Sequence, residues 1–361
     1  MKILCVIDYL GSGGAQRQLV NLAIGFKHHG HDVSFLVYHQ HNFYREMLAQ
    51  NNIDIHEIID PNYFYRFLKI RQFIRKGRFD AVLSFLEAAN FLCEMSGFPK
   101  KNWSLIVGER SSNPNMFRSL KSILFKYSHF FADFVVANSF TNINMVKKIN
   151  PFLPSRKCKV IYNYVDFNKW RPAKNHIPMQ NGKLRLVVLA SHRYLKNLNG
   201  LVEATNLLSD NEKAKLEIHW YGDEHDNSKA EGLVKIKLYN LEKNFNFYPA
   251  TLDVHSMVRN ADVVGLFSFY EGLPNTICEG MSAGKVVISS HVSDIKSIVN
   301  DDKLVFDPSN PAEIAQVLSR VIHLNPNEIE EIGVQNNKRA QLLFNNDSII
   351  NEYLMLLSSG R

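Results

Sequence analysis

The sequence predicts an α/β protein built from two doubly wound parallel sheets. Short apolar runs of strand length alternate along the chain with longer segments whose apolar residues recur at helical spacing. This alternation is typical of strands and helices wound around a parallel sheet. The 361 residues provide material for about two domains. A segment without periodicity, residues 170–182, carries two prolines and divides the alternation into two halves.

The composition excludes several other classes of protein. With 45% hydrophobic and 21% charged residues, the chain is neither disordered nor of low complexity. Its four cysteines form no cluster at metal-ligand spacing, so no metal site is expected. No apolar run approaches the roughly 20 residues of a membrane span, and Asp8 comes too early for a signal peptide. We therefore expect a cytoplasmic protein. The net charge of +7 favours an anionic partner.

The first half predicts one domain over residues 1–168. It opens with a strand, a glycine-rich turn at 11–14, a helix over about 15–28 and a second strand, which together form one βαβ unit. The strands are expected at 3–7, 33–37, 81–84, 105–107, 134–137 and 160–162. Helices are expected before or between these strands.

The second half predicts a similar domain over residues 169–346. Its strands are expected at 184–190, 216–221, 245–248, 263–267 and 286–289, and two of its helices at about 198–208 and 311–322. The last segment, 347–361, has apolar residues at helical spacing and is expected to return to the first domain. We expect the two domains to face a common cleft.

The most informative segment is 269–284. Glu271 follows an apolar strand, at the end where open α/β sheets bind their ligands. A helix beginning near Asn275 and stopped by Gly284 would direct free backbone N–H groups at an anion, with Glu279 on the same face as Asn275. Carboxylates accept hydrogen bonds from sugar hydroxyls, so a nucleotide sugar suits this arrangement. The alternative is an ordinary loop carboxylate and an exposed helix charge.

This segment closely resembles the E-x7-E motif, with its Glu-Gly-Leu-Pro-Asn core, of the retaining nucleotide-sugar glycosyltransferases of family 4. The resemblance covers nearly the whole chain, because three further segments are similar to family motifs and occur in the same order. They are Gly13-Gly14-Ala15-Gln16-Arg17, residues 132–139 and Tyr162-Asn163-Tyr164-Val165-Asp166. It implies the GT-B fold, with an acceptor-side first domain and a donor-binding second domain. It also implies transfer, with retention, from a UDP- or GDP-linked sugar to a saccharide or lipid-linked saccharide, without a metal or other cofactor.

The resemblance implies roles for individual residues. Glu271 would contact the donor sugar and Glu279 the ribose, while Lys196, the firmer assignment, and Arg193 would hold the diphosphate. The remaining implied donor-binding residues are Gly272, Leu273, Pro274, Asn275 and Thr276 in the motif and Gly13 and Gly14 in the glycine loop. The alternatives are a solvated basic turn within 189–197 and a plain tight turn at 11–14.

The acceptor side is less well defined by the sequence. Arg17, Glu109 and Arg110 are candidates to orient the acceptor or the donor sugar, with an internal ion pair as the alternative for Glu109 and Arg110. Two basic stretches, 66–78 and 116–127, combine cations with apolar residues. They predict either peripheral contact with an anionic membrane or ordinary helices with solvated basic faces.

The chain also departs from the family. Residues Ser293-Asp294-Ile295-Lys296-Ser297 stand where members commonly carry a Gly-Gly-x-x-Glu turn. This departure favours one alternative, a member that binds a sugar nucleotide or a membrane without turnover. A second alternative is a GT-B sugar-nucleotide epimerase, although the E-x7-E segment and the Gly-Gly-Ala-Gln-Arg loop fit the transferases better. Nucleic-acid binding would use the net charge, but no signature of a nucleic-acid-binding motif is present.

Overall fold

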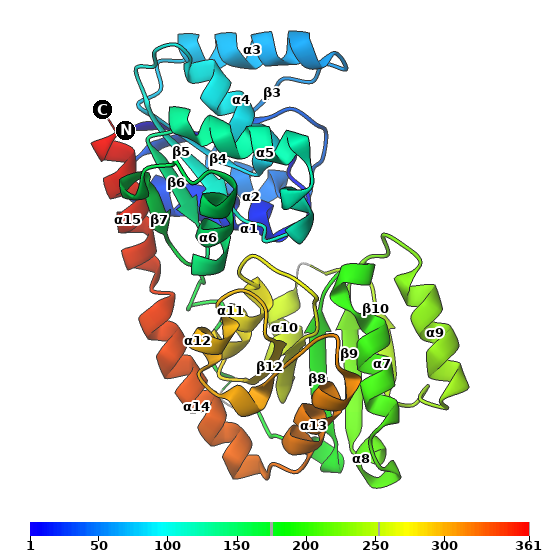
Figure 1. Cartoon of the computed structure of the whole chain (residues 1–361). Coiled ribbons are helices and arrows are strands. Elements are labelled where there is room, and N and C mark those ends of the chain that lie inside the picture. The colour runs from blue at the N-terminus through cyan, green and yellow to red at the C-terminus, as the bar shows by residue number, and fades with distance from the viewer. Residues whose placement is uncertain (174–175, 252, 361) are drawn as a thin grey trace. The chain divides into compact units, whose positions relative to one another are not determined.

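The chain forms two compact units in a computed structural model that describes residues 1–173, 176–251 and 253–360 (Figure 1). Unit 1 comprises Met1–Tyr164 and Asn346–Arg361, and unit 2 comprises Val165–Asn345. The division thus falls between residues 164 and 165, whereas the sequence placed it at 168. Residues 174 and 175 of the expected linker lie outside the described part of the chain.

The sheet of unit 1 has seven strands in the order β3-β2-β1-β4-β5-β6-β7, and all neighbouring pairs are parallel. The strands are β1 (Lys2–Val6), β2 (Asp32–Val37), β3 (Asp54–Glu57), β4 (Ala81–Phe85), β5 (Ser104–Glu109), β6 (Phe134–Ala137) and β7 (Cys158–Val160). The chain moves outward from β1 to β3 and then restarts on the other side at β4. This order is that of a doubly wound sheet.

Successive residues of a strand point to opposite sides of the sheet, so the buried strands of unit 1 place apolar side chains on both faces. Helices cover both of these faces. One core contains Phe26 of α1, Phe35 of β2 and Tyr353 of α15, and the other contains Ile70 of α3 and Val82 of β4. The helices of unit 1 are α1 (Gly14–His28), α2 (Arg45–Gln50), α3 (Tyr63–Lys76), α4 (Glu87–Gly97), α5 (Leu120–Tyr127), α6 (Phe140–Ile149) and α15 (Asn346–Ser359). Short 3-10 turns are η1 (Pro114–Phe117), η2 (Ser128–Phe131) and η3 (Ser155–Lys157).

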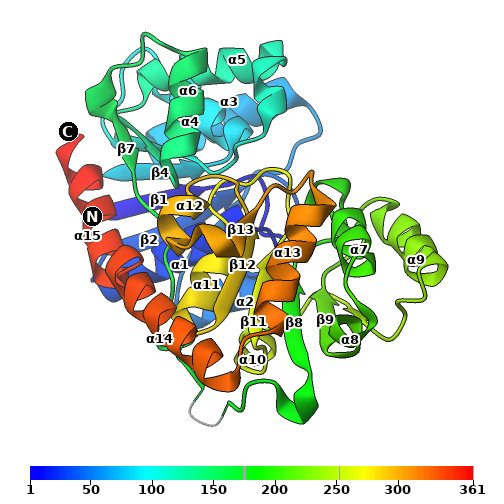
Figure 2. The same ribbon diagram turned by 60° about the horizontal axis from the view of Figure 1, so that its bottom comes forward.

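Unit 2 has a six-stranded parallel sheet in the order β10-β9-β8-β11-β12-β13. Its strands are β8 (Leu184–Leu189), β9 (Leu216–Tyr221), β10 (Phe245–Tyr248), β11 (Val263–Leu266), β12 (Val286–Ser290) and β13 (Val305–Phe306). Its helices are α7 (Leu198–Asn206), α8 (Asp210–Ala214), α9 (Ser228–Leu238), α10 (Val254–Arg259), α11 (Asn275–Ser282), α12 (Ile295–Val299), α13 (Pro311–Ile322) and α14 (Pro326–Leu343). Helix α7 packs between α9 and α13 (Figures 1 and 2).

The 3-10 turns of unit 2 are η4 (Gln180–Gly182), η5 (Tyr194–Lys196) and η6 (Asp302–Leu304). The strand order of unit 2 reads 3-2-1-4-5-6 when its strands are numbered from β8, which is the Rossmann order. Each unit therefore has a switch point, between β1 and β4 in unit 1 and between β8 and β11 in unit 2. Open sheets of this kind bind ligands at the carboxyl ends of the strands beside the switch point.

The expected strands are present, with small differences in their ends. The strand expected at 160–162 is β7 at Cys158–Val160, and the stretch 116–127 is broken at Ser119, whose hydroxyl caps α5. The sequence missed β3, a short edge strand, and β13, which is only two residues long. Among the described residues, no helix has both the length and the apolar character needed to cross a membrane.

Candidate active site

The switch point of unit 2 brings together three segments that are far apart in the sequence. The N–H of Phe269, after β11, donates to the Leu195 carbonyl after β8 at 2.9 Å. The rings of Tyr194 and Phe269 stack with their centroids 5.3 Å apart. In the first turn of α11, the Thr276 hydroxyl donates to the Leu189 carbonyl at 3.3 Å. The turn at 193–197, the loop at 267–274 and the start of α11 therefore form one local site.

An ion pair joins two of the predicted residues in this site. Lys196 Nζ lies 2.5 Å from Glu271 Oε1, which also accepts a hydrogen bond from the Ser268 hydroxyl at 2.8 Å. Both side chains of the pair are about one-fifth exposed, at 20% and 19%. The pair is thus held in position by neighbouring groups while one side stays open to solvent. An accessible cation beside an accessible carboxylate suits a ligand that carries both phosphate and hydroxyl groups.

Helix α11 begins at the same edge. Pro274 is its N-cap residue, and the Pro274 side chain itself makes no capping hydrogen bond. Helix N-termini favour anions because their N–H groups and dipole point outward. Gly284, at φ +69°, follows the helix, as the sequence predicted for its stop.

The second carboxylate of the motif is buried inside α11. Glu279 is only 5% exposed. The alternative of an exposed helix charge at this position is therefore wrong. In the turn before the helix, Gly272, Leu273 and Pro274 are also buried, whereas Asn275 and Thr276 are half-buried.

Arg193 lies in the same turn as Lys196 but does not join the ion pair. Its side chain is exposed, and no contact with Glu271 is seen among the described residues. The N–H of Tyr194 donates to Asp226 at 2.8 Å, so the loop after β9 holds the start of the turn. The Ser228 hydroxyl and this N–H lower the pKa of Asp226, and the charge of Arg193 adds a smaller effect. Of the two predicted diphosphate ligands, the structure brings only Lys196 to Glu271.

At the switch point of unit 1, the glycine loop connects β1 to α1. Gly13 is the N-cap of α1, and both Gly13 and Gly14 are exposed, while Arg17 is half-buried in the next turn. The loop therefore lies at the edge where a ligand of this sheet would bind. Just before it, burial raises the pKa of Asp8, although the Tyr9 N–H donates to its carboxylate at 2.9 Å.

The other motifs of the family resemblance meet at the same edge of unit 1. The amide of Gln18, next to Arg17, makes two hydrogen bonds with the backbone of Tyr164, at 3.0 and 2.8 Å. Asn138 donates to the Asn163 side chain at 3.4 Å. These amides tie α1 and the ends of β6 and β7 together. The sequence analysis did not single out Gln18 as a residue that joins these segments. Its position one residue after the glycine-loop motif was the pattern that could have indicated it.

Glu109, a predicted acceptor-side residue, takes part in a buried network of ion pairs. Its side chain is 3% exposed and lies 2.7 Å from Lys126 Nζ and 3.1 Å from His129 Nε2. His129 Nδ1 lies 2.7 Å from Glu94, and Lys126 lies 2.9 Å from Glu87. The structure thus shows the internal ion pair that the sequence left open for Glu109.

The pKa values in this network follow from burial and charge together. Burial acts to raise the pKa of Glu109, but Lys126 and His129 outweigh it and bring that pKa to about 2. Burial acts to lower the pKa of His129, but Glu94 and Glu109 raise it to about 9. Burial likewise opposes the charge of Lys126, yet its carboxylate partners raise its pKa. Glu109, Lys126 and His129 are therefore all charged near neutral pH.

Arg110 links β5 to the C-terminal helix. Its guanidinium donates to the Tyr353 hydroxyl of α15 and, at 3.5 Å, to Asn163. The same group lies 3.9 Å from the centre of the Phe85 ring. These contacts give Arg110 a structural role within unit 1.

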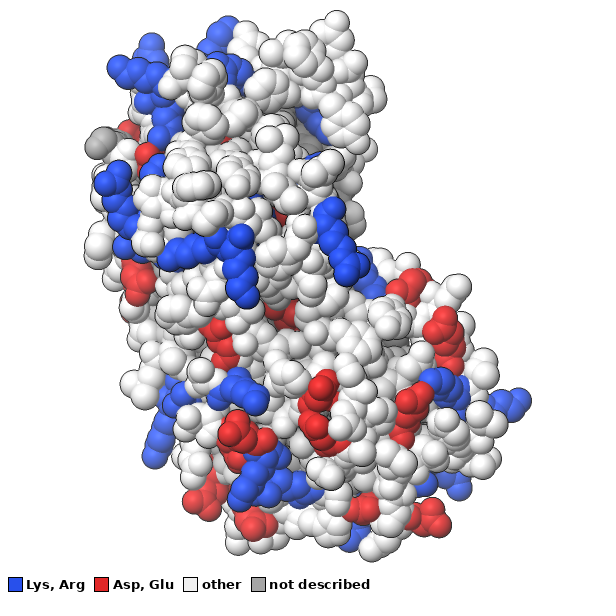
Figure 3. Space-filling view, viewed as in Figure 1, with Lys and Arg blue, Asp and Glu red and all other residues white. Residues whose placement is uncertain are grey.

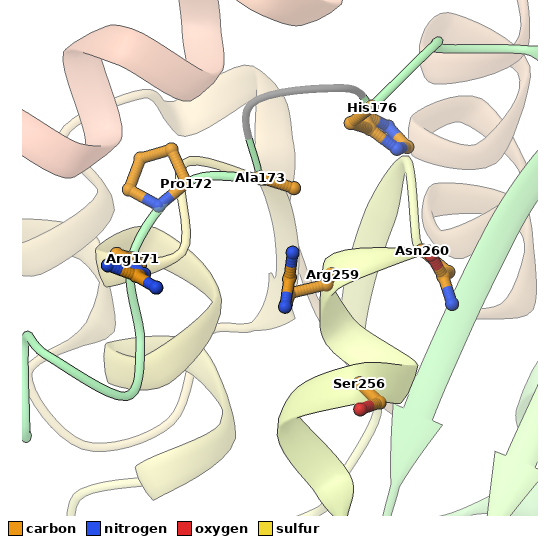
Figure 4. A pocket seen from close by; sticks show the side chains of 7 residues that line it. All are labelled: Arg171, Pro172, Ala173, His176, Ser256, Arg259 and Asn260. Carbon is orange, nitrogen blue, oxygen red and sulfur yellow. The ribbon is translucent and has the colours of Figure 1, made fainter.

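A cavity of about 500 Å³ lies elsewhere in unit 2 (Figure 4). Its lining residues are Arg171, Pro172, Ala173, His176, Ser256, Arg259 and Asn260. These residues precede β8 and β11 in the chain, so the cavity lies at the amino-terminal edge of the sheet. That edge is opposite to the one that carries Lys196 and Glu271. Within the described ranges, no three His, Cys, Asp or Glu side chains are grouped to hold a metal ion.

Two Rossmann-type sheets, one of which carries a lysine, two glutamates and the start of a helix at its switch point, define a class of two-domain proteins suited to nucleotide-linked ligands. Residues 12–169 match the family described as Glycosyltransferase Family 4, and residues 171–339 match the family described as Glycosyl transferases group 1. The chain belongs to glycosyltransferase family 4, and it is a transferase with the GT-B fold. Family membership favours a transferase over the epimerase considered from the sequence.

Three relatives show how far the similarity extends. An N-acetyl-D-galactosaminyltransferase of Campylobacter jejuni, whose name gives GalNAc-alpha-(1->4)-GalNAc-alpha-(1->3)-diNAcBac-PP-undecaprenol as acceptor, is 25% identical over 99% of this chain and 98% of its own length. Anabaena Alr3699/HepE, solved with UDP and glucose, is 18% identical with a TM-score of 0.87, covering 99% of this chain and all of its own. A glycosyltransferase of Rickettsia africae is 19% identical with a TM-score of 0.81, covering 99% and 98%.

Proposed function

We propose that this glycosyltransferase moves a sugar from a nucleoside diphosphate sugar to a lipid-linked saccharide, with retention of anomeric configuration, in glycan biosynthesis. The observation that carries the proposal is the Lys196–Glu271 pair beside the start of α11 at the switch point of unit 2. A diphosphate needs cations and N–H donors, and a sugar needs hydroxyl acceptors. Lys196, Glu271 and the start of α11 bring groups of both kinds to this one site.

The roles of the residues follow from their chemistry. Lys196 and the first N–H groups of α11 would stabilise the diphosphate as its charge increases on leaving. Glu271 would accept hydrogen bonds from the donor sugar, and Glu279, one turn inside the helix, would contact the ribose. Arg193, exposed in the same turn, would supply a second cation to the diphosphate. The donor side then requires no metal ion.

Retention requires the acceptor oxygen to bond on the face from which the diphosphate leaves. The bond between the anomeric carbon and the diphosphate oxygen breaks while the new carbon–oxygen bond forms. The acceptor hydroxyl then gives its proton to the departing diphosphate oxygen. The protein contributes orientation and charge stabilisation to this step.

Two relatives support the choice of substrates. The Campylobacter enzyme acts, by its name, on an undecaprenol-linked saccharide, and the Anabaena protein has been solved with UDP-glucose. We therefore propose a UDP-linked donor as the first choice and a GDP-linked donor as the second. The acceptor would be a saccharide on a polyprenyl diphosphate.

The test is a panel of UDP-, GDP- and ADP-sugars with the purified protein, scored by release of nucleoside diphosphate. Glu271→Ala should abolish the release seen with the wild type. Glu330→Ala, which changes an exposed glutamate of α14, is the matched control and should keep wild-type activity. Absence of release from every donor in the wild type, with and without a lipid-linked acceptor, would contradict the proposed function.

We further propose that unit 1 receives the acceptor at an anionic membrane surface. Unit 1 contains 22 Lys and Arg against 13 Asp and Glu, whereas unit 2 contains 20 against 22. The face drawn in Figure 3 carries basic side chains with few acidic ones on unit 1 and both signs on unit 2. Large apolar side chains are exposed on α3 and α5 of unit 1: Tyr63, Phe64, Tyr65, Leu120 and Leu124. Cations and exposed apolar groups together favour binding to anionic lipid.

Flotation with vesicles tests this membrane contact. Wild-type protein should float with vesicles that contain anionic lipid and less with neutral ones. Replacing Leu120 and Leu124, which are 84% and 59% exposed, with serine should reduce flotation without changing donor turnover. Leu342→Ser on α14, where the side chain is 85% exposed in unit 2, is the control. Equal flotation of all variants would contradict the proposed surface.

A further inference from the structure

His192 occupies an unusual position beside the candidate donor site. It lies between β8 and the turn that carries Lys196, and it is only 1% exposed. Its ring stacks on Trp220 of β9 with centroids 5.5 Å apart and planes at 20°. On another side it contacts Phe247 of β10, also at 5.5 Å. The imidazole is therefore enclosed by aromatic rings at the carboxyl ends of three neighbouring strands.

The enclosed ring has no hydrogen-bond partner for either nitrogen among the described residues. A neutral imidazole carries one N–H donor and one acceptor, and leaving both unpaired in an interior opposes folding. A phenyl ring of similar size would fill the same space without that cost. A position that breaks a packing rule in this way points to a role beyond packing.

The backbone of His192 joins two loops of the site. Its N–H donates to the Asp223 carbonyl at 2.8 Å, and its own carbonyl accepts from the N–H of His225 at 3.1 Å. The loops are so close here that a Cβ on Gly222 would lie 2.0 Å from the Ala190 carbonyl oxygen. The ring and backbone of His192 thus connect the turn at 193–197 to the loop after β9.

The surroundings of the ring favour its uncharged form. Burial and the nearby Lys229 of α9 lower the pKa of His192, while Glu224, Asp223 and Asp226 of the loop after β9 oppose them. Lys229 itself pairs with Glu224 at 2.8 Å and lies over the Phe247 ring. A protonated ring would carry two N–H donors, and no acceptor for either is present among the described residues.

We propose that His192 is a positioning residue of the donor site. Uncharged, it stays between Trp220 and Phe247 and holds the turn of Arg193 to Lys196 where a donor diphosphate is bound. Protonated, it leaves this enclosure, and the turn loses its support. This inference rests on the proposed function for its effect on the donor, but its effect on the turn does not depend on that function.

The consequence is a donor affinity that falls in acid. A diphosphate esterified to both a nucleoside and a sugar has no proton that titrates near neutral pH. A change of donor affinity in this range therefore comes from a titrating group of the protein. The turn carries Lys196, so loss of its position weakens donor binding before it changes the chemical step. The Michaelis constant for the donor should therefore respond more than kcat.

The experiment compares donor KM and kcat at about pH 7.5 and about pH 5.5 in the wild type and three variants. In the wild type, KM should rise in acid by up to about tenfold, because pH 5.5 lies about one unit below the ordinary pKa of an imidazole released from the enclosure, with a smaller change in kcat. His192→Phe keeps an aromatic ring that cannot be protonated, so its KM should stay low at both pH values. His192→Ala removes the ring, so its KM should be high at both. His219→Phe is the control, because His219 also stacks on a tyrosine and has a lowered pKa, and it should behave as the wild type.

Hydrogen exchange of the peptide covering residues 193–197 tests the turn without any donor. Exchange, corrected for the intrinsic effect of pH, should increase in acid for the wild type and stay constant for His192→Phe. A wild-type rise in KM or in exchange that persists in His192→Phe would overturn the proposal. If the wild type turns over no donor, the proposed function fails, and the exchange result alone decides the role of His192.

Discussion

Lys196 and Glu271 compensate each other's charge at the switch point of unit 2, and the Ser268 hydroxyl adds a further contact to the carboxylate. Each group needs the other to be held in place, because a charge that is four-fifths buried is costly without a partner. A donor diphosphate would share Lys196 with Glu271 and so remain close to the carboxylate that contacts its sugar. The Lys196–Glu271 ion pair would thus also orient the donor, with its diphosphate at Lys196 and its sugar at Glu271.

Removal of the cation tests this arrangement. Lys196→Met should lower kcat/KM by roughly 10²–10³, because a preorganised group that stabilises the leaving charge is lost. Lys237→Met changes an exposed lysine of α9 and serves as the control. Steady-state kinetics with the best donor measure both variants. Equal kinetics of Lys196→Met and the wild type would exclude Lys196 from the donor site.

Deprotonation of His129 should lower the stability of the fold in alkaline solution. Its folded pKa of about 9 lies above the ordinary value of 6.5, so its contribution is fully present below about pH 6.5 and disappears as the pH rises through about 9. Lys126 stays charged over this range because its pKa is raised. The Tm of the wild type should fall by several degrees between about pH 7 and about pH 10, since ~1 kcal/mol corresponds to ~2–4 °C.

The matched variant is His129→Gln, which cannot be protonated in this range. It should be less stable at neutral pH and show a smaller fall in Tm on going to alkaline solution. Calorimetry at both pH values provides the comparison. An identical fall in both proteins would assign the alkaline transition to other groups.

At the residue scale, the sequence predicted which side chains come directly after a strand but not which groups pack behind them. The positions of Glu271 and Lys196 after β11 and β8 were readable from apolar runs and turns. The ion pairs of Glu109 were not, because they depend on Lys126 of α5 and His129 of η2, which are distant from Glu109 in the sequence. The burial of Glu279 was not readable either. Site roles beyond this geometry remain predictions.

At the scale of elements, α15 shows how a distant segment completes a domain. It packs on β4, β5 and α1 of unit 1, where Ile349, Ile350, Tyr353 and Leu357 are buried. Its apolar spacing was readable from the sequence, which placed the segment at 347–361 against the observed helix at Asn346–Ser359. The edge strands β3 and β13 were not readable, because four alternating or two apolar residues give too weak a pattern.

Truncation of Tyr353 should therefore destabilise unit 1. Tyr353→Ala removes a ring that is 1% exposed, packs edge-on against Phe26 and accepts a hydrogen bond from Arg110. The expected cost is about 3–5 kcal/mol, as for other buried aromatic side chains. Fluorescence of Trp103, with Trp170 and Trp220 of unit 2 replaced by phenylalanine, reports the unfolding of unit 1.

The same substitution should leave unit 2 unchanged. A protein in which only Trp220 is retained would show this by a constant denaturation midpoint for its tryptophan signal. Tyr353→Phe, which loses only the hydroxyl bond to Arg110, should cost about 0.5–1.5 kcal/mol. A shift of the Trp220 signal as large as that of Trp103 would contradict independent units.

At the scale of the whole molecule, two sheets of related strand order carry different charge. The first six strands of unit 1 follow the order 3-2-1-4-5-6, as do the six of unit 2. Yet the excess of basic residues lies entirely in unit 1, with 22 against 13, while unit 2 is slightly acidic. The overall charge of +7 thus combines +9 on unit 1 with −2 on unit 2. An anionic partner recognised by net charge belongs on unit 1.

This distribution predicts that ionic strength acts on the two substrates differently. Raising salt from about 50 mM to about 500 mM shortens the range of charge interactions severalfold. The apparent KM for a lipid-linked acceptor in anionic vesicles should rise, whereas the donor KM at the partly enclosed Lys196–Glu271 pair should change little. Arg118→Glu with Lys121→Glu, two exposed cations of unit 1 beside Leu120, should raise the acceptor KM at low salt and remove most of its salt dependence. The matched pair Lys237→Glu with Lys338→Glu on unit 2 should change neither the acceptor KM at low salt nor its salt dependence. An equal effect of the two pairs would show that total charge, rather than its location on unit 1, governs acceptor binding.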